Sequence, residues 1–353
     1  MNIPELLQTV VSQNASDLHL VAGFPPAIRV DSVLFPIRSD AGKLSPEETE
    51  TLIFSLLSPE QKELLINNKE IDFSFQYENG ARFRVNAYSQ KGTWAAALRF
   101  LPAKIRGIEE LNLPGICHKF ATLKQGFVLV AGPTGHGKST SIAAMIDEIN
   151  HFRQAKIITI EDPIEYVYTP VKALISQREM HLDTHSWNMA LRSALREDPD
   201  VVLIGEMRDY ETIASALTIA ETGHLVFASL HTNDASQTID RVVDVFPENQ
   251  QDQVKLQLSN VLEGIVSQRL IPAIKGGRVP ATEILLATSA VRSSIREGKS
   301  YAIPNIIQTS GEIGMAPLEK SLAEWVKKGI VSLEVATEYS LHPEELVRQT
   351  RSR

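Results

Sequence analysis

A glycine-rich segment in the middle of the chain carries the side chains best suited to holding phosphate. It reads Gly132, Pro133, Thr134, Gly135, His136, Gly137, Lys138, Ser139 and Thr140, between an apolar run at 126–131 and a helical pattern at 141–150. This order fulfils G-x-x-x-x-G-K-[ST] in the strand-to-helix context that the pattern requires. Its glycines let backbone N–H groups curl around phosphate oxygens, and the N-terminus of the following helix adds a favourable partial charge.

Two side chains of this segment have predicted roles in binding. Lys138 is placed to meet the β- and γ-phosphates of a nucleotide, and the Ser139 hydroxyl is placed to hold Mg²⁺. His136 occupies a freely variable position, and we interpret it as a solvent-facing loop residue. The alternative, a glycine-rich turn that binds nothing, is disfavoured because both flanks and the Lys-Ser pair match the motif.

Carboxylates follow two other apolar runs. Glu161, Asp162 and Glu165 follow the run at 156–160, and Glu206 follows the run at 201–204. Hydrolysis of a triphosphate needs one carboxylate to position or deprotonate water and another group to hold the hydrated metal. We predict these roles for Glu165 and Glu206. For Glu161 and Asp162, a structural role as helix caps or as a pair of carboxylates in a turn fits as well as direct catalysis.

The residue before Glu206 limits how it can bind metal. Gly205 stands where many phosphate-loop enzymes carry the aspartate that organises the metal, so we expect Glu206 to contact Mg²⁺ through water. His224 and His231 bracket the apolar run 225–230. His231, at its carboxyl end, is predicted to sense the γ-phosphate through a hydrogen bond, while His224, at the opposite end, fits a structural role equally well.

The elements that position these residues follow from the apolar pattern. The runs at 126–131, 156–160, 201–204 and 225–230 do not alternate with polar residues, which is typical of strands buried on both faces of a parallel sheet. Ligands of open α/β sheets bind at the carboxyl ends of the strands, so the motifs at those ends are expected to converge. Residues from about 246 to 353 are predicted to be mostly helical.

The first hundred residues have a different pattern. Alternating apolar residues between 71 and 101, with Asn79-Gly80 between two of the runs, predict a hairpin, and helices are expected at 3–13 and 45–57. Ser45 is the predicted N-cap of the second helix, with Pro46 at its first position and Glu48 completing a capping box. We therefore expect a small α+β domain at 1–101 and a linker at 102–120.

Composition excludes several classes of protein. The 353 residues include 35 Lys and Arg against 43 Asp and Glu, a formal net charge of -8, which disfavours nucleic-acid binding as the main task. No apolar stretch approaches the roughly 20 residues of a membrane span, and the N-terminus lacks the pattern of a secretory signal. Cys117, the one cysteine, can form neither an internal disulfide nor a multi-thiolate zinc site. We expect a cytosolic protein.

Taken together, the motifs resemble those of the secretion ATPases of the type II/type IV pilus superfamily, most closely its pilus retraction ATPases. In that family GPTGxGKST, IEDPIE, LREDPDxxLxGEMRD and AETGHLVFxxLHT occur in this order. Here they stand at residues 132–140, 160–165, 195–209 and 220–232, and residues 15–31 resemble the opening of the family's PAS-like domain. The resemblance implies an α/β fold with an N-terminal PAS-like α+β domain, then a RecA-like P-loop NTPase domain at 121–353 with a C-terminal helical part.

The resemblance also implies an activity, partners and a location. The expected protein is an ATP-hydrolysing homohexameric motor, using ATP and Mg²⁺, at the cytoplasmic face of the inner membrane beside a pilus platform protein and, in some systems, a paralogous retraction ATPase. Glu165 would be the catalytic glutamate, Glu206 the Walker B acid and His231 the residue of the His box. The family also brings arginines to the γ-phosphate. Arg84 and Arg99 are the best matches and Arg82 and Arg106 the reserves, although solvated charges on an exposed sheet face explain them almost as well.

Retraction is favoured over pilus extension or type II secretion by two features. Extension and secretion members usually carry an additional N-terminal region and many a four-cysteine zinc site, which one cysteine cannot form. Residues 290–298, AVRSSIREG, resemble the AIRNLIREG motif of retraction ATPases and predict a short helix capped by Ser289, with Val291 and Ile295 on an apolar stripe. A nucleic-acid translocase and a scaffold that binds ATP without hydrolysing it are the remaining alternatives.

Overall fold

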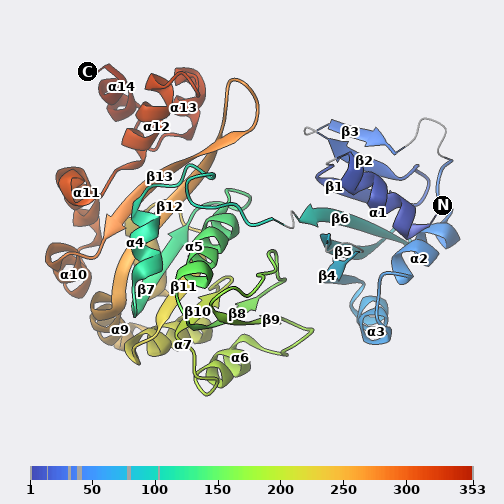
Figure 1. The fold of residues 1–353 in the computed structure, drawn as a ribbon, viewed down its shortest axis with the longest axis horizontal. Helices are drawn as coiled ribbons and strands as arrows, with labels where there is room; N and C mark the ends of the chain where they lie inside the picture. The colour runs from blue at the N-terminus through green and yellow to red at the C-terminus, as the bar shows by residue number, and fades with distance from the viewer. Residues whose placement is uncertain are drawn as a thin grey trace. The chain divides into compact units, whose positions relative to one another are not determined.

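A computed structural model of the chain describes residues 2–13, 15–30, 33–37, 42–77, 81–101 and 104–351. The chain forms two compact units. The first comprises residues 1–104 together with the short segment Pro163–Val167, and the second comprises Ile105–Asp162 and Tyr168–Arg353. Each unit has a sheet of its own and is described by itself (Figure 1).

The first unit is an antiparallel sheet with helices on one face. The strand order is β3-β2-β1-β6-β5-β4. The strands are β1 (Asp17–Val21), β2 (Ala27–Val30), β3 (Val33–Pro36), β4 (Glu70–Gln76), β5 (Arg82–Gln90) and β6 (Thr93–Leu101), and the helices are α1 (Ile3–Ser12), α2 (Pro46–Phe54) and α3 (Pro59–Asn68). Alternate residues of β5, such as Phe83 and Val85, join the helices in one core, which leaves the other face of the sheet half-exposed.

Local signals in this unit were predicted correctly. The Ser45 hydroxyl accepts from the backbone N–H of Glu48, and the Glu48 carboxylate accepts from the N–H of Ser45, so the capping box at α2 is confirmed. Strands β4 and β5 pair antiparallel, as the alternation predicted. The turn predicted at Asn79-Gly80 and residues 102–103 of the expected linker lie outside the described residues.

The second unit is built on a mostly parallel sheet. Its strand order is β13-β12-β7-β11-β10-β8-β9, in which only β12 and β13 pair antiparallel. The strands are β7 (Gly126–Ala131), β8 (Lys156–Glu161), β9 (Leu174–Glu179), β10 (Val201–Ile204), β11 (Leu225–Leu230), β12 (Leu262–Pro272) and β13 (Arg278–Leu286). Every residue of β7, β10 and β11 is buried, as expected for strands covered on both faces.

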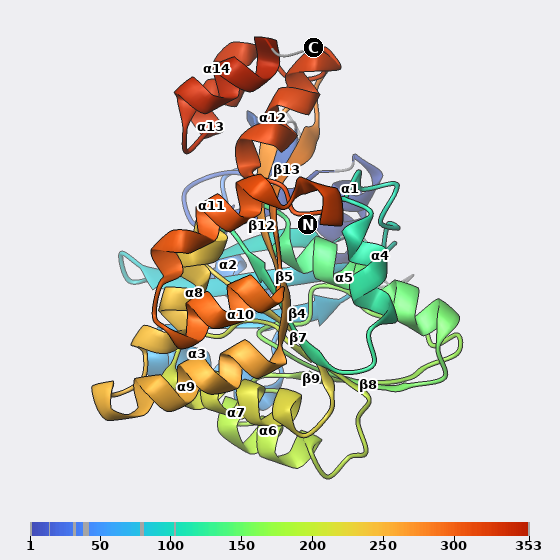
Figure 2. The ribbon, with the colours of Figure 1, turned by 90° about the vertical axis from the view of Figure 1, so that its left-hand side faces the viewer.

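Helices cover both faces of this sheet. Figure 2 shows α4 and α5 on one side and α8, α9 and α10 on the other. The helices are α4 (Ile116–Thr122), α5 (Lys138–Phe152), α6 (Trp187–Ala194), α7 (Tyr210–Glu221), α8 (Ala235–Asp244), α9 (Glu248–Val261), α10 (Ser289–Arg296), α11 (Ile303–Thr309), α12 (Leu318–Lys327), α13 (Leu333–Tyr339) and α14 (Pro343–Arg351), with 3₁₀ turns η2 (Ser300–Ala302) and η3 (Gly311–Ile313). No described helix is both long and apolar enough to cross a membrane.

The prediction that residues from about 246 to 353 are mostly helical is wrong for residues 262–286. This stretch forms β12 and β13, which pair antiparallel from Gly264↔Leu286 to Pro272↔Arg278. Gly276 and Gly277 adopt positive φ in the connecting turn, a conformation that glycine enters at little cost. The paired glycines between two runs rich in β-branched residues were the hairpin signal that the helical interpretation overlooked.

Helix α10 contains the segment that resembles the retraction motif. Its N-cap is Thr288, whose hydroxyl accepts from the N–H of Val291, so the predicted cap at Ser289 is wrong by one residue. Val291 and Ile295 are buried as predicted. Arg292 donates to the carbonyls of Ser259 (2.6 Å) and Asn260 (2.8 Å), in the last turn of α9, and to Glu263 of β12 (3.0 Å). One guanidinium therefore satisfies the carboxyl end of α9 and joins it to α10.

The packing at Gly264 gives a prediction of stability. A Cβ added there would lie 2.3 Å from Cζ of Phe120 and 2.9 Å from the carbonyl oxygen of Leu285, so we expect Gly264→Ala to destabilise the fold by about 1–3 kcal/mol. Gly115→Ala is the matched control, because a Cβ there meets nothing within 4 Å. Thermal unfolding of both variants tests this, and equal melting temperatures would contradict the packing described.

Candidate functional site

The glycine-rich segment 132–140, which is predicted to bind phosphate and is called the phosphate loop, forms the turn from β7 into α5. Gly132, Gly135 and Gly137 all adopt positive φ, which residues with a side chain rarely enter. A Cβ on Gly132 would lie 2.3 Å from the carbonyl oxygen of Gln268 on β12. The loop therefore depends on glycine both for its backbone conformation and for its close approach to the neighbouring strand.

Lys138 is held inside this loop. Its buried ammonium donates to the carbonyl oxygens of Gly132 (2.7 Å) and Pro133 (3.0 Å) and lies 3.2 Å from Nδ1 of His231. Ser139, by contrast, is exposed, and its hydroxyl has no hydrogen-bond partner among the residues that the structure describes. One cation and one available hydroxyl thus stand at the N-terminus of α5, where an anion is favoured.

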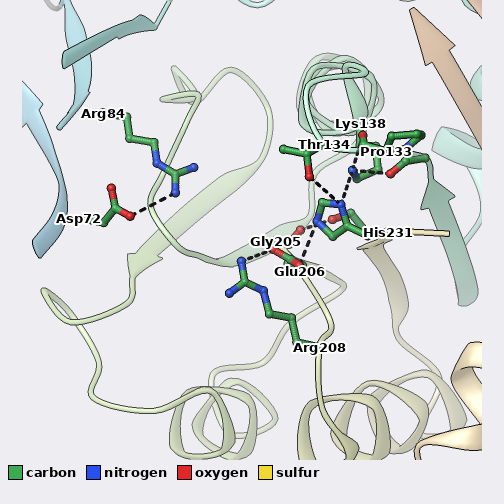
Figure 3. A network of polar contacts seen from close by, with 11 residues as sticks. Asp72, Arg84, Pro133, Thr134, Lys138, Gly205, Glu206, Arg208 and His231 are labelled. Atoms are coloured by element: carbon green, nitrogen blue, oxygen red, sulfur yellow. Dashed lines mark hydrogen bonds and ion pairs between the residues drawn. The ribbon is translucent and has the colours of Figure 1, made fainter. Parts of the chain in front are cut away.

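His231, at the carboxyl end of β11, connects Lys138 to Glu206. Its Nε2 lies 3.0 Å from Oε1 of Glu206, and its Nδ1 lies 3.2 Å from both Lys138 Nζ and the Thr134 hydroxyl (Figure 3). A neutral imidazole protonated on Nε2 satisfies this arrangement, because it donates to the carboxylate and accepts from the ammonium. The sequence thus predicted correctly that these strand ends converge.

The electrostatics of the site agree with a neutral His231. Burial lowers the pKa of His231, and the charge of Lys138 lowers it further, against the opposing effect of Glu206. Burial alone would raise the pKa of Glu206, but the hydrogen bond from Arg208 and the positive charges of Arg208 and Lys138 act against it, and that pKa lies below its usual value. Glu206 is therefore held as a carboxylate beside a neutral ring.

Arg208 is a site residue that the sequence analysis missed. Its guanidinium donates to Oε2 of Glu206 at 2.7 Å (Figure 3). The Arg208 carbonyl accepts from Arg241 of α8. Arg208 also lines a small cavity together with Asp162, Trp187, Glu206, Asp209 and Thr212. The signal was available, since Arg208 stands two residues after Glu206 in the quoted motif.

Gly205 lies where the sheet leaves little room for a side chain. A Cβ at this position would lie 3.2 Å from Cα of Glu161 on the adjacent strand β8. The Gly205 carbonyl accepts from the hydroxyl of Ser229 on β11 at 2.6 Å, which fixes the segment that carries Glu206. An aspartate at position 205 would crowd this space.

The contacts that join Lys138, His231 and Glu206 involve neither the other carboxylates nor the second histidine singled out in the sequence. Glu161 and His224 make structural contacts instead. Glu161 is buried and accepts from Thr159 Oγ1 (2.7 Å) and Gln177 Nε2 (3.3 Å). His224 Nδ1 lies 3.0 Å from the Ile219 carbonyl at the end of α7, at the edge of the sheet opposite the phosphate loop. Asp162 is exposed, and half-buried Glu165 falls in the segment grouped with the first unit.

Arg84 and Arg99 share one face of the first unit's sheet. They are directly opposite each other in the β5–β6 ladder. Arg84 lies 3.7 Å from Asp72 (Figure 3), and Arg99, with 67% of its side chain exposed, donates to Asp17 at 3.0 Å. Of the reserves, Arg82 donates to Ser74 at 2.5 Å, while Arg106 is exposed in the second unit. Two arginines thus project side by side, each beside an aspartate.

Comparison with known proteins agrees with this geometry. A family model described as Type II/IV secretion system protein matches residues 2–294. The chain belongs to this family. Its relatives include the type IV pilus retraction ATPase PilT of Pseudomonas aeruginosa, 48% identical over 98% of this chain and 99% of that one, and a twitching motility protein of Neisseria gonorrhoeae, 45% identical over 98% and 92%.

Solved structures support the same place within the type II/IV secretion family. The structure of the pilus retraction motor PilT with bound ADP has a TM-score of 0.91 and 47% identity, covering 99% of each chain. The prediction of an ATPase of type IV pilus retraction and twitching motility is thereby confirmed, and the mixed α/β fold matches. Nucleotide binding is confirmed as well, whereas Mg²⁺ stays a prediction.

The position of Lys138 gives a prediction of binding. Lys138→Ala removes the buried ammonium, so we expect nucleotide affinity to fall roughly 10- to 100-fold and ATP turnover to be lost. Lys172→Ala, at an exposed position of the same unit, is the control and should behave as the parent chain. Titration with a fluorescent ATP analogue checks the affinity, and normal binding by Lys138→Ala would refute the assignment of the loop.

Proposed function

We propose that the second unit hydrolyses Mg²⁺-ATP at the loop 132–140 and that Lys138, His231 and Glu206 act as one connected site. The observation that carries this proposal is the continuous chain of contacts from the Lys138 ammonium through the neutral His231 ring to the Glu206 carboxylate. It joins the group that would hold the phosphates to the carboxylate that would contact the metal through water.

Mg²⁺ fits the donor set at this site. Ser139 supplies an exposed hydroxyl and Glu206 a carboxylate, the hard oxygen ligands that Mg²⁺ prefers. The described chain has no group of three or more His, Cys, Asp or Glu side chains able to hold a metal, which agrees with an ion held by few protein ligands together with water and phosphates. When bound, Mg²⁺ would neutralise charge that develops on the phosphate oxygens.

The residues of the chain divide the remaining work. Bound phosphate oxygens would compete with the carbonyls of Gly132 and Pro133 for the protons of the Lys138 ammonium. The hydrogen bond from this ammonium to His231 Nδ1 would then change. Through its Nε2, which lies 3.0 Å from Oε1 of Glu206, His231 would transmit the presence of phosphate to that carboxylate. Glu165 is proposed as the catalytic base, since its carboxylate has no hydrogen-bond or ion-pair partner among the described residues.

Arg84 and Arg99 are proposed to bring positive charge to the γ-phosphate. Their opposite positions on β5 and β6 would let two planar guanidinium groups address one phosphoryl group. To do so, each must exchange its aspartate, Asp72 or Asp17, for phosphate oxygens. These aspartates thus keep the arginines oriented while no phosphate is bound.

The assembly and location belong to the same proposal. We propose that the first unit is a PAS-like domain and that the second is a RecA-like ATPase domain with a C-terminal helical part. Six copies of the chain would form a ring, and their domains would rotate against each other during turnover. The ring would act at the cytoplasmic face of the inner membrane on a platform protein, alongside a paralogous retraction ATPase where one is present, with no nucleic acid involved. The mass of the purified assembly tests the hexamer.

Glu206→Gln separates hydrolysis from binding. The amide oxygen still accepts from His231 Nε2, so we expect nucleotide affinity within about twofold of the parent chain, whereas hydrolysis falls about 100-fold or more because the carboxylate is gone. Glu50→Gln, on the exposed face of α2, is the control for a lost surface carboxylate. Single-turnover hydrolysis and equilibrium binding are measured on each protein. A variant that hydrolyses ATP normally would overturn the role of Glu206.

The arginine proposal is tested by replacing each guanidinium. We expect Arg84→Ala and Arg99→Ala each to lower kcat about 100-fold or more, with nucleotide affinity changed far less, because the charge is needed mainly in the transition state. Arg29→Ala is the control, since Arg29 lies near the same Asp17, at 3.9 Å. If both variants hydrolyse ATP as fast as Arg29→Ala does, the proposal is wrong, and Arg84 and Arg99 are solvated charges on an exposed sheet face.

A further inference from the structure

Part of β12 runs beyond the end of its partner strand. Strand β7 pairs with β12 as far as Ala131↔Ser267, where the chain turns into the phosphate loop. The next residues of β12, from Gln268 to Leu270, therefore lie beside the loop instead of a strand. On its other side β12 stays paired with β13, with Leu270 opposite Pro280. The loop must supply the hydrogen-bond partners that β7 no longer offers.

His136 supplies one of those partners with its side chain. Its Nδ1 accepts from the backbone N–H of Leu270 at 3.0 Å. Its carbonyl accepts from Nε2 of Gln268 at 2.8 Å, and the same Gln268 side chain accepts from the Ser141 hydroxyl of α5 at 2.7 Å. The prediction that His136 is a solvent-facing loop residue is therefore wrong, because its ring reaches a strand 134 positions further along the chain.

A second glycine of the loop also lies close to β12. A Cβ on Gly137 would lie 2.9 Å from Nε2 of Gln268 and 3.2 Å from Cδ1 of Leu270. With no side chain at this position, the loop lies close enough for the His136 ring to reach the Leu270 backbone. The ring of Tyr339, at the end of α13, lies 6.3 Å from the His136 ring, and the Tyr339 carbonyl accepts from Arg269.

The surroundings of the ring favour the form that can accept this bond. Burial lowers the pKa of His136, and the positive charges of Arg269 on β12, Lys138 on α5 and Arg278 on β13 lower it further. Arg278 also donates to the carbonyl of Gly135 at 3.4 Å. The neutral ring, protonated on Nε2 and accepting on Nδ1, is thus favoured over the imidazolium, which cannot accept.

We propose that His136 is a positioning residue for nucleotide binding: its Nδ1 ties the phosphate loop to β12 and so holds the loop ready to receive phosphate. This inference rests on the proposed role of the loop in holding the phosphates of the nucleotide. The loop then loses less conformational freedom on binding, which increases affinity without touching the reacting atoms. A side chain without an acceptor at the δ position leaves the Leu270 N–H unpaired and the loop less restrained.

Three substitutions in the full chain distinguish an acceptor at the δ position from mere size or polarity. In His136→Asn the amide oxygen stands near the place of Nδ1, whereas in His136→Gln the amide lies one carbon further out, and His136→Ala removes the acceptor. We expect the Gln and Ala variants to bind a fluorescent ADP analogue roughly five- to tenfold more weakly, with KM for ATP raised in parallel. Their kcat is expected to stay within about twofold, and His136→Asn is expected to bind as the parent chain does.

A pH series adds a readout that a purely structural role would not move. The affinity of the parent chain should decline as the pH falls through the lowered pKa of His136, because protonation of Nδ1 removes the acceptor. His136→Asn should lack that component. Thermal unfolding of each variant checks its folding, and if His136→Ala does not fold, the comparison of Asn with Gln decides.

Several results would overturn the proposal. They are equal affinities for the Asn and Gln variants, parental affinity in His136→Ala, or the same acid-dependent loss in His136→Asn as in the parent chain. Failure of the parent chain itself to bind the ADP analogue would instead refute the role of the loop, so the two failures are distinguishable.

Discussion

The contact between the phosphate loop and β12 is the constraint on which the rest of the second unit depends. A loop that circles phosphate must expose its N–H groups inward, and here its outer side is pressed against the backbone of Gln268. A side chain at Gly132 would meet the Gln268 backbone, and a side chain at Gly137 would crowd the side chains of Gln268 and Leu270. The antiparallel pair β12 and β13 thus forms the wall behind the loop, since Gln268 of β12 lies against Gly132 and Arg278 of β13 donates to the Gly135 carbonyl.

The charges of the site are arranged around one neutral ring. Lys138 and Glu206 would attract each other directly if nothing separated them, but His231 lies between them and bonds to both. Arg208 occupies the other carboxylate oxygen of Glu206. A carboxylate with both oxygens already paired is preorganised, and its surroundings need little rearrangement when charge develops nearby.

Sequence reasoning succeeded where the determinants are local. The capping box of α2, the buried parallel strands and the loop between β7 and α5 are each encoded within a few neighbouring residues. It failed where the partner is distant. Leu270 lies 134 positions from His136, and periodicity carries no information about which strand lies beside which loop. The wrong helical interpretation of 262–286 removed the one element whose presence would have suggested a contact for His136.

The guanidinium of Arg292 has a mechanical consequence. Its bonds end on the main chain of Ser259 and Asn260 and on the side chain of Glu263, so α10, the end of α9 and the start of β12 are joined at one point. Main-chain carbonyls cannot rotate away as side chains can. Because α9 ends at Val261 and β12 begins at Leu262, a displacement of α10 would act on the junction of these two elements, in the strand that forms the wall behind the phosphate loop. In a motor protein, a connection of this kind would limit the part of each conformational change that is not transmitted between the elements it joins.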